Sequence, residues 1–122
     1  MSLAVMACES PEGSDGLDPR LSVIQEEVFT PSCALSSCHD AGGPEAMLDL
    51  SEGASHASTV NVMGSLAPVV RVIPGDPDGS LLVQAIEGTA PAPINRMPVG
   101  LVLEDEKVDV IRQWIEDGAA ND

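Results

Sequence analysis

The stretch that decides the fold is CALSSCH, residues 33–39, in which two cysteines separated by four residues are followed at once by a histidine. Thiolate and imidazole side chains bind zinc and iron, and paired cysteines also form disulfides. A disulfide between Cys33 and Cys38 would leave His39 without a role. A tetrahedral zinc site would need His56 as its fourth ligand, and the chain has no second closely spaced ligand pair.

A helix is predicted immediately before this stretch. Asp18 is an N-cap acceptor and Pro19 suits the first helical position, so the pair predicts the helix start. Pro31 predicts its end, because a proline disfavours helical backbone in the residue before it. Between these points, apolar residues recur on one helix face at spacings of three and four, and they are Leu21, Ile24 and Val28.

Further helices are predicted after the stretch. A short one covers residues 51–60. The next follows Asp76 as its N-cap and ends at Gly88, with an apolar face made of Leu81, Leu82, Ala85 and Ile86. Residues 89–100 contain three prolines and no helical period, so they predict a loop.

The last predicted helix begins with the acidic residues 104–106, which are favourable at the positive end of a helix dipole. Gly118 ends it, and its apolar stripe is Val108, Ile111, Trp114 and Ile115. Residues 69–73 are the only candidate strand in the chain. The sequence therefore predicts an all-α fold.

The composition indicates one domain with an unusual core. The chain has 122 residues and is 43% hydrophobic, but it contains only one Trp, one Phe and no Tyr. Aromatic side chains usually supply much of the core of a small domain, and long loops are uncommon in one. A bulky prosthetic group at the centre would account for both features.

The net charge limits the partners. Asp and Glu number 20 against 5 Lys and Arg, which gives a formal charge of −15. Nucleic acids and anionic membranes require basic residues to neutralise phosphates, so neither is expected as a direct partner. The chain has no run of 18 apolar residues, so no membrane-spanning helix is predicted.

The first residues predict a separate segment. Leu3 to Cys8 resembles the end of a bacterial lipoprotein signal, in which the cysteine receives lipid, and residues 9–16 are polar and acidic. We expect residues 1–17 to be a truncated signal remnant and flexible tether, and residues 18–122 to be the domain. A tail with an incidental cysteine is the alternative.

The order Cys-Cys-His resembles the haem-attachment site of bacterial monohaem c-type cytochromes of the cytochrome-c-like lipoprotein type. The resemblance implies thioether bonds from Cys33 and Cys38 to a haem and an axial bond from His39 to its iron. The spacing here is C-x4-C-H, two residues longer than the usual C-x2-C-H. Short segments across residues 21–119 are also similar to that family, namely 24–29, 48–50, 60–62, 72–77, 80–82, 111–115 and 118–119.

The same resemblance implies a second axial ligand. Met97-Pro98 lies in the loop before the last helix, where small cytochromes c place a methionine ligand. Met63 or Met47 are alternatives, as is His56, which is otherwise expected at the surface. Arg96 is a candidate partner for a haem propionate, although an ordinary exposed arginine is the favoured interpretation.

The implied protein is an all-α, cytochrome c-like electron carrier with one covalent haem c, located in the periplasm or cell envelope. Its first and last helices would cross, with Trp114 packed near Phe29. Its redox partner is expected to have a basic docking face, because this chain is acidic. It would contact a membrane only through lipid on Cys8. The alternatives are a haem-free binding module with a Cys33–Cys38 disulfide and a haem enzyme or sensor with a labile methionine ligand.

Overall fold

The computed structural model describes residues 17–34, 38–39, 47–100 and 102–122. In chain order its helices are α1 (Leu21–Ile24), η2 (Gln25–Cys33), α2 (Ser55–Thr59), α3 (Leu81–Glu87) and α4 (Asp105–Glu116). No strand occurs within those ranges, so the predicted all-α class is confirmed. Cys8 and residues 9–16 of the predicted tether lie outside the described residues.

The first helix starts and ends later than predicted. Its N-cap is Arg20 rather than Asp18, and the backbone N–H of Leu21 donates instead to the side chain of Asp122 at 2.9 Å. α1 continues directly into the π-helix η2, which runs through Pro31 to Cys33. A π-helix bonds each N–H to the carbonyl five residues back, and this wider turn leaves room for the proline ring.

The middle of the chain has less regular structure than predicted. Within the predicted helix at residues 51–60, only the five residues of α2 are helical. The candidate strand at residues 69–73 does not form; two isolated bridges join Val72 to Val60 and Val70 to Met63. These bridges fold the segment between α2 and α3 back on itself.

The predicted start of α3 is also wrong, although its end is confirmed. Ser80 rather than Asp76 is the N-cap, and the Ser80 hydroxyl donates to the Asp76 carbonyl at 2.8 Å. Asp76 accepts a bond from the N–H of Gly79, so it closes the preceding turn. Gly88 ends α3 in the left-handed conformation, with φ 81°. Residues 89–100 contain no helix, as predicted.

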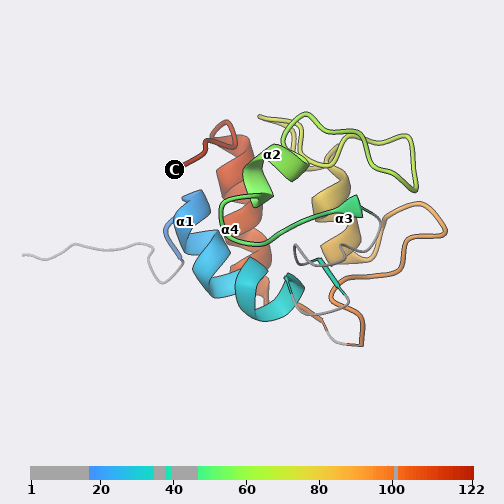
Figure 1. The fold of residues 1–122 in the computed structure, drawn as a ribbon, viewed down its shortest axis with the longest axis horizontal. Helices are drawn as coiled ribbons and strands as arrows, with labels where there is room; N and C mark the ends of the chain where they lie inside the picture. Colours follow the sequence, from blue (N-terminus) through green and yellow to red (C-terminus); the bar gives the residue numbers. More distant parts are fainter. Residues whose placement is uncertain (1–16, 35–37, 40–46, 101) are drawn as a thin grey trace, which may run out of the picture.

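The core lies where α4 packs against α1 and α3 (Figure 1). Trp114 and Phe29 are each 1% exposed and belong to one buried cluster, so the predicted place of Trp114 in the core is confirmed. α4 also buries Val110, whereas the predicted core residue Val108 is half-buried. The other members of the cluster are mainly aliphatic. The loops before and after α3 extend away from α1 in Figure 1.

Candidate functional site

The two cysteines of the deciding stretch have different surroundings. Cys33 ends η2 and is 8% exposed within the core cluster, whereas Cys38 is exposed. Burial raises the pKa of the Cys33 thiol to about 11, and the nearby Cys38 acts in the same direction. Both are free thiols, so the structure does not contain the disulfide of the alternative interpretation.

His39 is held at three points. Its backbone N–H donates to the carbonyl of Cys33 at 3.0 Å, and its carbonyl accepts from the N–H of Leu50 at 2.7 Å. Its ring nitrogen Nδ1 lies 3.0 Å from the carbonyl oxygen of Leu48. A carbonyl oxygen only accepts, so Nδ1 must carry the proton in this bond. In the neutral ring, Nε2 then keeps its lone pair for a metal.

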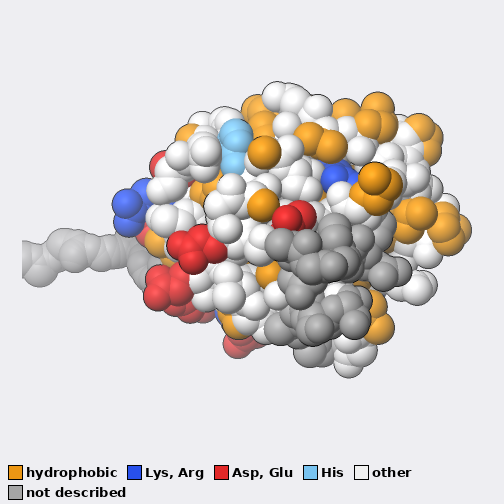
Figure 2. Space-filling view, viewed as in Figure 1, with side chains coloured by type: hydrophobic (Ala, Val, Ile, Leu, Met, Phe, Trp, Pro, Cys, Tyr) orange, Lys and Arg blue, Asp and Glu red, His pale blue; other side chains and the backbone are white. Residues whose placement is uncertain are grey.

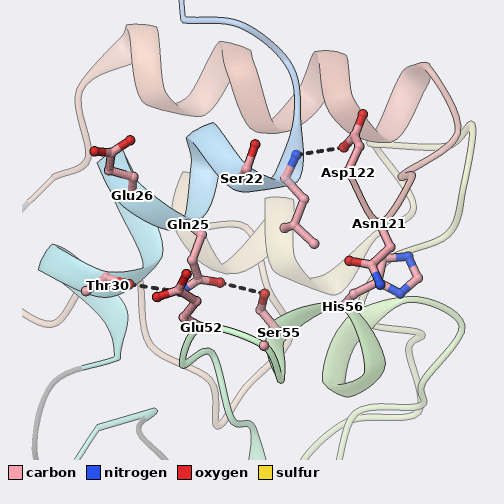
Figure 3. Close-up of a pocket in the computed structure, with 11 residues that line it drawn as sticks. Ser22, Gln25, Glu26, Thr30, Glu52, Ser55, His56, Asn121 and Asp122 are labelled. Atoms are coloured by element: carbon pink, nitrogen blue, oxygen red, sulfur yellow. Dashed lines mark hydrogen bonds between the residues drawn. The ribbon is translucent and has the colours of Figure 1, made fainter.

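Gln25 anchors the segment that holds His39, and its role was not predicted from the sequence. It is 6% exposed, and its Nε2 group donates to the carbonyl of Leu50 at 2.8 Å. The same group donates to the hydroxyl of Thr30 at 3.0 Å, and Oε1 accepts from the hydroxyl of Ser55 at 2.7 Å. The bond to Ser55 connects η2 to α2 (Figure 3), and the bond to Leu50 connects η2 to residues 48–50.

Met97 is attached to α3. Its backbone N–H donates to the carbonyl of Ala85 at 2.8 Å, and its side chain is half-buried against the core cluster. The alternative methionine ligands are more exposed than Met97: Met63 is 56% exposed and Met47 is 78% exposed. Met97 is therefore the methionine most enclosed by the fold among these three.

Arg96 is exposed, and its side chain lies over Gly88 at the end of α3. A Cβ atom added to Gly88 would be 3.2 Å from Cδ of Arg96. Arg96 also contributes to lowering the pKa of Glu87, after the larger effect of the hydrogen bond from Arg112. The structure thus shows an exposed arginine against the end of α3.

His56 is half-buried on α2, and its Nε2 lies 3.0 Å from the carbonyl of Ala119. It lines an open pocket between α1, η2, α2 and the last residues of the chain (Figure 3). The pocket lining includes neither cysteine of the deciding stretch, nor His39 or Met97. A carbonyl oxygen only accepts, so Nε2 of His56 carries the proton in this bond and Nδ1 is the nitrogen left to bind a metal.

The zinc interpretation gains no support from the described residues. Among them, no three His, Cys, Asp or Glu side chains gather closely enough to hold a metal ion. A haem iron needs fewer protein ligands than a zinc ion, because the porphyrin supplies four ligands and the protein only one or two. The imidazole of His39 and the half-buried thioether of Met97 are donor types that haem iron binds.

Large hydrophobic side chains are exposed on the loops, and this feature was not predicted either. They are Met47, Met63, Leu66, Val99 and Val102, each between 53% and 78% exposed. Figure 2 shows hydrophobic side chains on the side of the molecule formed by the loops around α3, whereas acidic side chains gather over the opposite side. The signal in the sequence was the presence of apolar residues in segments without helical period.

Comparison with known proteins assigns no family to the chain. None of the helices in the described part of the chain is long and apolar enough to cross a membrane. No protein family, curated protein or solved structure matches the chain.

Proposed function

We propose that this protein is a one-electron carrier with one haem c, attached through Cys33 and Cys38 and ligated by His39 and Met97. The observation that carries the proposal is the bond between Nδ1 of His39 and the carbonyl of Leu48. This bond sets the tautomer that a metal-binding imidazole needs, directly after the second cysteine of the motif. When bound, the haem supplies a ferric–ferrous couple.

His39 contributes a fixed donor atom. Its backbone bonds to Cys33 and Leu50 hold the main chain, and the bond from Nδ1 to the carbonyl of Leu48 orients the ring. The Nδ1–H group donates to the carbonyl of Leu48, and this bond increases the electron density that Nε2 offers to a metal. A ligand held in this way changes little between two oxidation states, as rapid electron transfer requires.

Met97 contributes a soft thioether. Its backbone is attached to α3 through Ala85, and its half-buried side chain packs against the core. Methionine ligation favours the reduced iron and raises the potential relative to a second imidazole. With both axial positions occupied by side chains, an electron carrier fits better than an enzyme or sensor that binds a small molecule.

The surface is consistent with a cofactor beside the loops. The exposed apolar side chains of Met63, Leu66, Val99 and Val102 would lose contact with water against a macrocycle. The charge of −15 favours a partner with a basic docking face. Haem c attachment places the protein outside the cytoplasm, in the periplasm or cell envelope, and lipid on Cys8 would anchor it there.

The test is the intact mass and the absorption spectrum of the chain after expression with a haem c maturation system. We expect the added mass of one haem and a reduced spectrum typical of two thioether bonds. A Cys33→Ala, Cys38→Ala double variant should carry no covalent haem and serves as the matched control. A wild-type mass two protons below that of the thiol form, without a Soret band, would contradict the proposal and favour the disulfide-containing binding module.

A further inference from the structure

The side-chain amide of Gln25 is buried, and both its nitrogen and its oxygen have hydrogen-bond partners. A buried side-chain amide is costly unless its donors and its acceptor are satisfied. Gln25 meets this condition through Thr30, Leu50 and Ser55, which belong to different parts of the chain. The close-up in Figure 3 shows its bonds to Thr30 and Ser55.

The backbone of Leu50 links Gln25 to His39, because it forms a hydrogen bond with each of them. The carbonyl of Leu50 accepts from Gln25 at 2.8 Å, and the N–H of the same residue donates to the carbonyl of His39 at 2.7 Å. Two residues earlier, the carbonyl of Leu48 bonds to the imidazole. Residues 48–50 therefore touch His39 twice and are fastened to η2 by Gln25.

A second hydrogen bond holds residues 48–50 to α2. The backbone N–H of Asp49 donates to the hydroxyl of Ser58 at 3.0 Å. Gln25 also accepts from Ser55 of the same helix. The segment is thus held between η2 and α2, and Gln25 is the residue that bonds to both the segment and α2.

We infer that Gln25 is a positioning residue for His39: it holds residues 48–50 so that the Leu48 carbonyl keeps the proton on Nδ1. This inference rests on the proposed function for the role of His39 as an iron ligand. The positioning itself is a property of the polypeptide and can be measured apart from haem loading.

The chemistry of the amide explains why other residues would fail. A leucine would fill most of the space but would leave the carbonyl of Leu50 and the hydroxyl of Ser55 without this partner. A glutamate has the same shape, but when ionised it has no proton to donate to Leu50. Both Gln25→Leu and Gln25→Glu should loosen residues 48–50.

The experiment measures solvent exchange of the His39 Nδ1–H by NMR in the full chain, under reducing conditions that keep any low-spin haem iron ferrous and diamagnetic. The variants are Gln25→Leu and Gln25→Glu. The control is Ser80→Ala, because Ser80 is also fully buried and bonded to two backbone groups, Ile73 and Asp76, but not to residues 48–50. Ser80→Ala thus imposes a comparable buried hydrogen-bond loss elsewhere.

We expect exchange in both Gln25 variants to be at least about tenfold faster than in wild type, the effect of losing roughly one hydrogen bond. Ser80→Ala should retain the wild-type rate. In haem-loaded protein the reduction potential should rise in the Gln25 variants alone, because a weaker bond at Nδ1 makes His39 a poorer donor.

The outcomes separate the two proposals. Wild-type exchange that is unprotected, or equal rates in the Gln25 and Ser80 variants, would overturn the positioning role. Protected exchange that depends on Gln25 in a chain that takes up no haem would support the positioning role and contradict the proposed function.

Discussion

Gly88 connects the end of α3 to the loop that carries Met97, so Gly88→Ala tests how closely the two are coupled. Gly88 has φ 81°, and this left-handed conformation costs an L-residue about 1–2 kcal/mol. The new Cβ would also lie 3.2 Å from Cδ and 3.4 Å from Cγ of Arg96, closer than ordinary contact. The Arg96 stem must move by a few tenths of an ångström, and Met97 is the next residue.

Gly75→Ala is the matched control. Gly75 has φ 85°, but a Cβ there meets nothing within 4 Å. Both variants should therefore lose about 1–2 kcal/mol in the free energy of unfolding, measured by urea denaturation. The Arg96 contact distinguishes them, because only Gly88→Ala displaces the residue before Met97.

The assay for the site is the long-wavelength charge-transfer band of a sulfur-to-iron bond in the ferric protein. We expect Gly88→Ala to shift or weaken this band and Gly75→Ala to leave it unchanged. Adding Arg96→Ala to Gly88→Ala should restore the band without restoring stability, because it removes the contact but not the backbone strain. An unchanged band in Gly88→Ala, or equal changes in both glycine variants, would refute the reasoning.

Three further outcomes are expected. Met97→Ala should abolish the sulfur-to-iron band and Met63→Ala should not; loss of the band only in the second would move the ligand to Met63. Asp122→Ala should lower the unfolding free energy by about 1 kcal/mol, because it removes the acceptor for the N–H of Leu21, and Asp122→Asn should lose less. Glu87→Gln should be destabilising at neutral pH. The ionised carboxylate of Glu87 accepts two hydrogen bonds from Arg112, and these bonds lower its pKa. The stabilisation is therefore fully present above the ordinary carboxyl pKa. It is lost as the pH falls through the lowered pKa of Glu87. A wild-type–variant difference that grew on acidification would contradict this.

The helix faces could be predicted from the sequence because they depend on local periodicity. Leu21, Ile24 and Val28 are buried as expected, and so is Trp114. The start of α4 was also predicted, because its acidic first turn is a local feature, but the starts of α1 and α3 were not. The N–H of Leu21 finds its acceptor at the far end of the chain, in Asp122, and a local search for a capping residue favoured Asp18.

For the candidate site, too, local sequence features could be predicted and long-range contacts could not. The deciding stretch identified His39, but its orientation depends on backbone carbonyls of residues 48–50, and a carbonyl has no residue signature. Gln25 gave no signal either, because its position in a helical segment is compatible with an ordinary exposed glutamine. The preference for Met97 came from its place in the chain, and its half-buried side chain favours it over the more exposed Met63.

The few aromatic residues of the chain lie in one part of the molecule. Phe29 and Trp114 lie in the core formed by the helices, which therefore has flat apolar side chains of its own. The exposed large hydrophobic residues of the described ranges all lie outside the main helices, Leu66 and Val99 among them. If the proposed haem is bound, these exposed side chains, rather than the core between the helices, are the apolar surface that it would cover. A haem bound there would stabilise the native state through the loops and Met97, while the helix crossing would retain its own buried contacts.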